Sequence, residues 1–336
     1  MGKVIISPTG YGGTGSSAIS DIFKEFNCCL SLGETELPFL YDLHGVSDLE
    51  YFLTDGNSRS KTPFAINQFI AYFKKNYSLY EKYFSPDFVK DLENYLSELN
   101  LTHFKKALLE FEVDSNLKRF LIFKLFAFLQ IKIAGFYRNN INEYSPFFPQ
   151  IKKSYTYLTR EQFSYITKRF TGALISRLDD INKYEFILLD QLFPPINTNR
   201  YNNYIENVKT IIVDRDPRDV FLLNNIQWKG ASYICDTKDV NEFIGWYRSM
   251  RLHRSANHIK DKSILEINFE DLIYDYDNTL SRICDFIGVN QESHTEKFKH
   301  FNPNISKRNT KLFEESNSFS KELIQIENSL GEFLYD

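Results

Sequence analysis

The N-terminal residues combine glycines and hydroxyl side chains in a spacing that suits a phosphorylated ligand. An apolar run that begins at Val4 leads into a loop with four glycines between Gly10 and Gly15, and Ser16 and Ser17 follow. Glycines let the backbone approach an anion closely, and the free N–H groups of a following helix point at it. An apolar pattern of helical period begins directly after the serines. We therefore expect a strand, a phosphate loop and a helix, with a tight turn that binds no ligand as the alternative.

The loop differs from the two best-known glycine-rich nucleotide motifs. In the Walker motif a lysine precedes the hydroxyl residue, whereas Gly15 precedes Ser16 here. The spacing Gly10-x-Gly12-x-x-Gly15 matches the letters of the dinucleotide fingerprint, but no second strand with a terminal acidic residue follows at the usual distance. The loop alone leaves the choice between a phosphate site and a plain turn open.

A second strand that runs directly into a helix is expected in the segment 210–220. Asp216 is a favourable N-cap and Pro217 suits the first helical position, so Arg215 stands at the carboxyl end of the strand. Open α/β sheets bind ligands at this edge, and a guanidinium grips a phosphate through two parallel hydrogen bonds. The alternative is a surface arginine that pairs with Asp214 or Asp216.

A third segment repeats the order of strand and helix. Ile264–Phe269 is expected to be a strand, and Asp277–Ile287 is expected to be a helix with its apolar residues on one face. Gly288 suits the position just after the end of that helix.

Together and in this order, the three segments resemble the sulfotransferase superfamily. The matching parts are the glycine loop, the Arg-Asp-Pro-Arg-Asp-Val segment that begins at Arg215, and the late segment from Phe269 to Gly288. The family uses 3′-phosphoadenosine 5′-phosphosulfate (PAPS) as sulfuryl donor and releases adenosine 3′,5′-bisphosphate. The resemblance implies that the N-terminal loop binds the 5′-phosphosulfate through Gly13, Thr14, Gly15, Ser16 and Ser17.

The resemblance also assigns the other end of the nucleotide. It implies that Arg215 binds the 3′-phosphate and that Lys307 or Arg308, in a late basic segment, contacts the same group. The family usually places a serine eight residues after the arginine. Leu223 occupies that position here, so Asn224, or Asn225 beside it, is the nearest polar substitute.

One family residue is missing from the loop. Sulfotransferases usually carry a Lys or Arg there, which stabilises charge on the leaving oxygen, and Gly13 occupies the position here. Preorganised positive charge at a developing anion contributes roughly 100-fold to 1000-fold in rate. Either another cation replaces it, with Arg59, Lys61 and Arg177 as the candidates, or turnover is slow. The helix N-terminus and backbone amides could supply part of the charge.

The reaction also needs a base that removes the proton from the acceptor hydroxyl. The segment that begins Gly33-Glu34 resembles the stretch that carries the glutamate base in tyrosylprotein sulfotransferases. Glu34 is therefore the first candidate, followed by Glu36 and His44, and a solvated acidic loop is the alternative. Sulfuryl transfer needs no metal, and no spacing of His, Cys or Asp indicates a metal site.

The composition is that of an ordinary globular protein, with 43% hydrophobic and 25% charged residues. A net charge of −4 gives no broad basic surface, so no nucleic-acid partner is expected. Four scattered cysteines and the lack of a basic leader favour a reduced, cytoplasmic protein. The most apolar stretch, Phe120–Lys132, contains Lys124 and is too short to span a membrane. A core helix is expected there, with a peripheral helix on a membrane surface as the alternative.

The chain is expected to form a single α/β domain over residues 1–336, with a central parallel sheet and a P-loop-like phosphate cradle. A large helical insertion is expected at about 60–175, where aromatic residues mostly form core, and a polar helical tail at about 291–336. The sheet resumes at Phe186–Gln191, which places Asp190 and Gln191 at its carboxyl edge. Within the insertion, helices are expected over Ala65–Tyr80, Pro86–Leu99 and Asn116–Tyr137.

The predicted function is the PAPS-dependent transfer of a sulfuryl group to a hydroxyl of a saccharide or glycolipid. The acceptor follows from what similar bacterial proteins do and from no residue of this chain. Two other classes stay open: a phosphotransferase that binds Mg-ATP in the same loop through Asp190 or Asp214, and a nucleotide-binding protein without catalysis, which Gly13 favours.

Overall fold

The computed structural model describes residues 3–33, 36–107, 121–122, 124–125, 128–129, 150–178, 181–226, 238–252, 261–316 and 318–335. The chain divides into two compact units, of which one comprises Met1–Asp42 and Thr171–Asp336 and the other comprises Leu43–Phe170. We call the first the sheet unit and the second the helical unit. The predicted insertion, residues 60–175, covers most of the helical unit.

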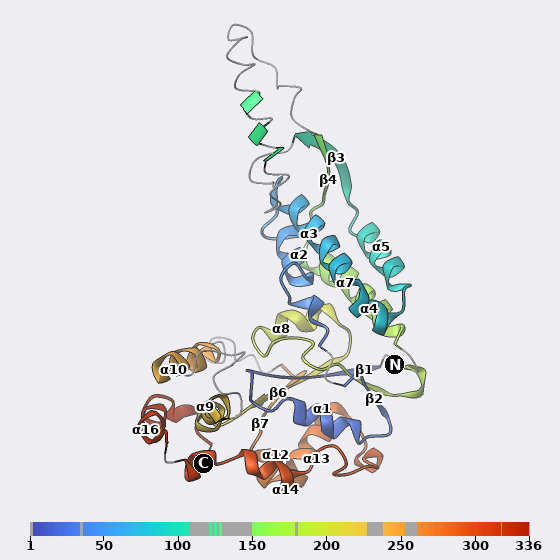
Figure 1. The fold of residues 1–336 in the computed structure, drawn as a ribbon. Coiled ribbons are helices and arrows are strands. Elements are labelled where there is room, and N and C mark those ends of the chain that lie inside the picture. The colour runs from blue at the N-terminus through green and yellow to red at the C-terminus, as the bar shows by residue number, and fades with distance from the viewer. Residues whose placement is uncertain are drawn as a thin grey trace. The chain divides into compact units, whose positions relative to one another are not determined.

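A parallel sheet forms the centre of the sheet unit (Figure 1). Its described strands pair in the order β2-β5-β1-β6-β7, and each pair is parallel. The strands β1 and β6 are almost wholly buried, which explains the apolar runs Val4–Ile6 and Ile211–Val213 within them. Because β1 lies beside β6, the loops that follow these two strands open at the same edge. The strands are β1 (Val4–Gly10), β2 (Cys29–Ser31), β5 (Phe186–Leu188), β6 (Val208–Asp214) and β7 (Ile264–Asn268).

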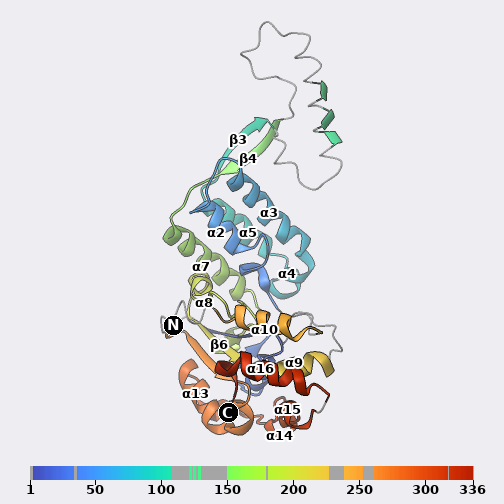
Figure 2. The ribbon, with the colours of Figure 1, turned by 90° about the vertical axis from the view of Figure 1, so that its left-hand side faces the viewer.

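The helices α1 (Ser17–Lys24) and α13 (Tyr276–Ile287) share one hydrophobic core with the sheet. The helix α13 ends at Gly288, whose φ of 84° is the left-handed conformation predicted for it. A second core joins α9 (Pro217–Ile226), α10 (Val240–Ser249) and α16 (Ser320–Ser329), which Figure 2 shows together. The shorter helices of this unit are α8 (Thr198–Tyr201), α12 (Asp271–Tyr274), α14 (Pro303–Ser306) and α15 (Leu312–Glu315).

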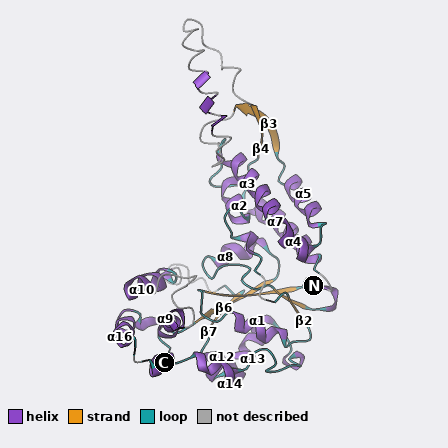
Figure 3. Cartoon of the chain, in the orientation of Figure 1, coloured by secondary structure: helices purple, strands orange, loops and turns teal. Residues whose placement is uncertain are grey.

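In the described part of the helical unit helices dominate, and β3 and β4 form an antiparallel pair (Figure 3). Its aromatic side chains form a core, as predicted, and Phe73, Tyr80 and Tyr95 are among those that are fully buried. The elements are α2 (Val46–Leu53), α3 (Lys61–Lys75), α4 (Tyr77–Phe84), α5 (Phe88–Glu98), β3 (Thr102–Ala107), β4 (Gln150–Tyr155) and α7 (Arg160–Ser176), which crosses the boundary between the units.

Two predictions for the helical unit need correction. The single helix expected over Ala65–Tyr80 is two helices, because Asn76 ends α3 and its side-chain amide donates to the carbonyl of Tyr72 at 3.1 Å. The core helix expected at Phe120–Lys132 is wrong for the side chains that are described, since Leu121 and Leu125 are 56% and 57% exposed. Helical periodicity identifies an apolar face but does not show whether that face is covered.

Much of the helix expected over Asn116–Tyr137 lies outside the described residues. None of the helices in the described part of the chain combines the length and hydrophobicity that crossing a bilayer requires.

Candidate functional site

The loop between β1 and α1 has the open backbone that its glycines predict. Gly12, Gly13 and Gly15 have φ values of 87°, 68° and 93°, a region that side chains other than glycine rarely enter. A Cβ at Gly15 would lie 2.4 Å from the ring of Phe269, so glycine is also required for space. Thr14 is buried, and its Oγ1 accepts the N–H of Tyr11 at 3.1 Å. Glycine conformations and one side-chain bond thus fix the shape of this loop.

The two serines follow the loop at the N-terminus of α1. Ser17 is exposed and Ser16 is half-buried. Ser16 occupies the N-cap position, yet its side chain makes no capping bond to the helix. The serines therefore stand where hydroxyl groups and the helix dipole would both favour an anion.

Arg215 lies directly after β6, as predicted, and its side chain is buried rather than on the surface. Its Nη1 donates to the carbonyl of Gly13 at 3.3 Å, and its Nη2 donates to the carbonyl of Asn309. The guanidinium also packs over the ring of Phe269, 4.7 Å from its centroid. Its Nε is buried with no hydrogen-bond partner among the described residues. Arg215 thus joins the glycine loop to the late basic segment.

Three buried carboxyl groups surround Arg215. Burial raises the pKa of Glu270 to about 7 and that of Asp219 to about 6, and the positive charge of Arg215 opposes both shifts. Burial likewise lowers the pKa of Arg215, against the effect of Asp219, Glu270 and Asp216. Asp216 accepts the N–H of Arg218 at 2.8 Å, which confirms its predicted role as N-cap of α9.

The late basic segment, which begins at Lys307, contacts Arg215 through its backbone. The carbonyl of Asn309 accepts from Arg215, while the side chains of Lys307 and Arg308 are exposed. The segment then continues into α15, whose first N–H groups donate to Asp219. The structure therefore brings together three of the predicted parts: the loop, Arg215 and the segment around Lys307.

Asn224 is fully buried in α9, and its amide donates to the carbonyl of Val220 in the same helix at 2.8 Å. Leu223, where the family usually has a serine, is also buried. The assignment of Asn224 to the nucleotide stays a prediction.

Of the candidate bases, Glu36 and His44 belong to different units of the chain. Glu34 lies outside these residues. Glu36 is exposed in the sheet unit. His44 belongs to the helical unit, where its backbone N–H donates to Asp48 at 2.7 Å. Glu34, Glu36 and His44 thus stay predictions as catalytic residues.

The candidate replacement cations are divided between the units. Arg59 and Lys61 belong to the helical unit, and Arg177 belongs to the sheet unit, where it is half-buried. A further arginine, which the sequence analysis missed, is fixed close to the loop. Arg251 is buried, its Nε donates to Asp214 at 3.0 Å, and its guanidinium lies 4.2 Å from the ring centroid of Tyr11.

The pairing of Arg251 with Asp214 bears on the alternative that the protein is a phosphotransferase. Both carboxylate oxygens of Asp214 accept from the guanidinium of Arg251, and one also accepts the backbone N–H of Arg215. A magnesium ion at Asp214 would have to displace these donors. Asp190, the other candidate, is buried and accepts from Ser20 at 3.1 Å. No three His, Cys, Asp or Glu side chains form a group that could hold a metal ion in the described ranges.

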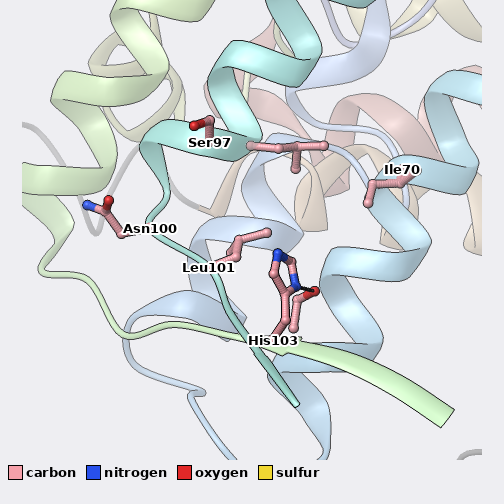
Figure 4. Close-up of a pocket in the computed structure, with 7 residues that line it drawn as sticks. Ile70, Ser97, Asn100, Leu101 and His103 are labelled. Atoms are coloured by element: carbon pink, nitrogen blue, oxygen red, sulfur yellow. Dashed lines mark hydrogen bonds between the residues drawn. The ribbon is translucent and has the colours of Figure 1, made fainter. Parts of the chain in front are cut away.

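The helical unit contains an open pocket of about 600 Å³ beside β3 and β4 (Figure 4). Ile70 and Leu101 contribute apolar surface, and the imidazole Nδ1 of His103 lies 2.8 Å from the Oγ of Ser154. None of the predicted site residues lines this pocket, so it adds nothing to the assignment of the nucleotide site.

Comparison with known proteins identifies the segment that contains Arg215. Residues 198–293 match the model of the sulfotransferase family, and they span β6, α9 and β7. This match covers less than a third of the chain, and it shows that the segment is similar to the sulfotransferase family. The resemblance that the sequence motifs predicted is thereby confirmed.

The similar proteins include a human enzyme and a bacterial domain. The chain is 29% identical to human sulfotransferase 2A1 over 141 residues, which are 39% of this chain and 47% of the relative. It thus matches about half the length of that curated relative. The sulfotransferase domain of the Synechococcus PCC 7002 olefin synthase aligns with a TM-score of 0.40 and 14% identity, covering 99% of this chain and 94% of that domain.

A third similar structure is retinol dehydratase in complex with androsterone and the inactive cofactor PAP. It aligns with a TM-score of 0.32 and 14% identity, covering 99% of this chain and 80% of that protein.

Proposed function

We propose that the protein transfers a sulfuryl group from PAPS to a hydroxyl group of an acceptor. The observation that carries the proposal is the position of Arg215, which lies at the carboxyl edge of the sheet and contacts both Gly13 and Asn309. It therefore sits between a loop suited to the 5′-phosphosulfate and a basic segment suited to the 3′-phosphate. The family match of residues 198–293, which include Arg215, agrees with this use.

The residues around Arg215 fit a nucleotide with phosphate groups at both ends. The Nε of Arg215 is buried without a partner among the described residues, and such donors normally find an acceptor. A 3′-phosphate would supply acceptor oxygens to this guanidinium, and Lys307 and Arg308 directly precede Asn309, whose carbonyl accepts from Arg215. At the other end, the loop offers backbone N–H groups and the hydroxyls of Ser16 and Ser17.

In the proposed reaction, the acceptor oxygen forms a bond to sulfur as the bond from sulfur to the 5′-phosphate oxygen breaks. The products are a sulfate ester and adenosine 3′,5′-bisphosphate, and the hydroxyl proton passes to a base. We assign this base to Glu34, ahead of Glu36 and His44, on the resemblance of its sequence context. The N-terminus of α1 would stabilise part of the charge on the leaving phosphate, where Gly13 replaces the usual cation.

We propose a saccharide or glycolipid hydroxyl as the acceptor. Resemblance to bacterial carbohydrate sulfotransferases is its only support. A panel of glycans, glycolipids, steroids and phenols with PAPS, assayed by release of adenosine 3′,5′-bisphosphate, tests this choice. Turnover with a steroid or phenol alone would refute the carbohydrate assignment and leave sulfuryl transfer intact.

The decisive experiment is calorimetry with adenosine 3′,5′-bisphosphate, 5′-AMP and Mg-ATP on the wild type and on Arg215→Ala. The first nucleotide should bind at micromolar concentration, at least tenfold more tightly than 5′-AMP, since a charge-assisted hydrogen bond contributes about 1.5–3 kcal/mol. Arg215→Ala should remove this preference. Tighter binding of Mg-ATP would refute the proposal in favour of a phosphotransferase.

A further inference from the structure

Asp219 connects α9 to the end of the late basic segment. Its side chain is 1% exposed. Its Oδ2 accepts the N–H of Lys311 and its Oδ1 accepts the N–H of Leu312, both at 2.8 Å. One carboxylate thus binds two consecutive backbone donors more than ninety residues away in the chain.

The backbone at Lys311 has a conformation that needs hydrogen bonds to hold it. Lys311 has a φ of 55°, a left-handed conformation that residues other than glycine adopt only where the surrounding structure holds them. The turn at Lys311 sets the direction in which the chain leaves the basic segment and enters α15. The bonds to Asp219 are therefore placed where they determine the path of that segment.

The other end of the same segment reaches Arg215. The carbonyl of Asn309 accepts from Arg215, and the hydroxyl of Thr310 lies 2.8 Å from that of Tyr274. Residues 307–312 are thus held at Arg215, at Tyr274 and at Asp219. The exposed cations Lys307 and Arg308 stand at the start of this segment.

We propose that Asp219 is a positioning residue for the 3′-phosphate, acting through the backbone of residues 307–312, which holds Lys307 and Arg308 at that group. The inference rests on the proposed function, because only a 3′-phosphorylated nucleotide needs this end of the site. Because Asp219 is negatively charged, the direction of the change in affinity distinguishes a positioning role from an electrostatic one. A carboxylate that acted by charge alone would repel the phosphate, so its removal would strengthen binding. Removal of a positioning residue weakens binding.

The test is calorimetry on the wild type, Asp219→Ala, Asp219→Asn and the control Asp239→Ala. Asp239 also accepts a backbone N–H, that of Asn241, at the start of α10 in the sheet unit. Asp219→Ala should weaken binding of adenosine 3′,5′-bisphosphate about tenfold and leave that of 5′-AMP within about twofold. Asp219→Asn keeps one accepting oxygen, so its affinity for the bisphosphate should lie between those of the wild type and Asp219→Ala. Asp239→Ala should keep the wild-type ratio of the affinities for the bisphosphate and 5′-AMP.

A double-mutant cycle shows whether the effect passes through the basic segment. In a background of Lys307→Ala with Arg308→Ala, the change Asp219→Ala should cost little further affinity, because the cations that it positions are gone. Additive losses would overturn the proposal, as would unchanged or tighter binding of the bisphosphate by Asp219→Ala.

Hydrogen exchange at the amides of Lys311 and Leu312 measures their hydrogen bonds to Asp219 directly. At least one of the two amides should exchange faster in Asp219→Asn than in the wild type, because the nitrogen that replaces one oxygen cannot accept. Unchanged exchange would refute the role of Asp219 even if Asp219→Ala does not fold. If the wild type fails to prefer the bisphosphate over 5′-AMP, the proposed function fails and this inference falls with it. If the wild type shows the preference and Asp219→Ala retains it, only the inference fails.

Discussion

At the scale of single residues, the site combines groups that the sequence reveals with groups that only burial reveals. Arg215 was predictable because a cation directly after an apolar run and before Asp-Pro marks the end of a strand and the start of a helix. Asp219 and Glu270 were not, because acidic residues near helix N-termini are common for reasons of the dipole alone. Their importance comes from contacts with Lys311 and Asp216, far along the chain.

Glu34→Gln tests the assignment of the base at this scale. With the acceptor that the panel identifies, kcat should fall about 100-fold or more, because a positioned base contributes 10²–10⁴-fold. The affinity for adenosine 3′,5′-bisphosphate should stay within about twofold of the wild type, since this nucleotide lacks the transferred group. Glu36→Gln, two residues away and exposed, is the matched control. A loss in the control with none in Glu34→Gln would transfer the role to Glu36.

At the scale of elements, the strands of the sheet and the ends of the helices were well predicted where local chemistry fixes them. Pro217 begins α9 and Gly288 ends α13, as their backbone preferences require. Two predictions failed, one because of a local side-chain contact and one because of burial. Asn76 divides one predicted helix into two, and Leu125 is exposed in a stretch that was expected to be core.

The proposed nucleotide binding depends on the loop between β1 and α1, and Gly15→Ala tests this loop. An added methyl group would meet Phe269 at 2.4 Å, on a backbone whose φ is 93°. The free energy of unfolding should fall by about 2 kcal/mol or more, and binding of adenosine 3′,5′-bisphosphate should be lost. Denaturant unfolding and calorimetry measure the two effects.

Gly172→Ala is the matched control for this change. Gly172 lies inside α7, and a Cβ there would meet no atom within 4 Å. The free energy of unfolding of this variant should rise by about 0.5–1 kcal/mol, because alanine is more stable than glycine in the interior of a helix. A Gly15→Ala protein as stable as the wild type would show that the loop does not need its left-handed backbone.

At the scale of the molecule, the sheet order brings together segments that are far apart in the sequence. Because β1 lies beside β6, the glycine loop contacts Arg215 at one edge, and Arg215 also contacts Asn309. The parallel sheet, and the edge at which Arg215 stands, were predictable from strand and helix patterns. The burial of three carboxyl groups beside one arginine was not, because it depends on the packing of the whole unit.

This buried cluster makes stability depend on pH. Glu270 is 2% exposed, and its pKa rises to about 7 from the usual 4.5 because burial disfavours its charged form. Between these values the folded protein binds more protons than the unfolded chain, so the free energy of unfolding falls as pH rises from about 5 to about 7. Arg215 opposes this shift by attraction, and Asp216 adds to it by repulsion.

Glu270→Gln should therefore flatten the decline of the melting temperature between pH 5 and pH 8, because a neutral amide binds no proton in this range. Gln keeps an oxygen to accept the N–H of Asp216, a bond of 3.0 Å in the wild type. A smaller decline should remain, since burial raises the pKa of Asp219 to about 6. The control is Glu296→Gln, whose carboxylate has a pKa lowered by its hydrogen bond to Lys299, and it should keep the wild-type profile. Equal declines in Glu270→Gln and the wild type would mean that Glu270 is ionised throughout this range, and that Arg215 outweighs burial.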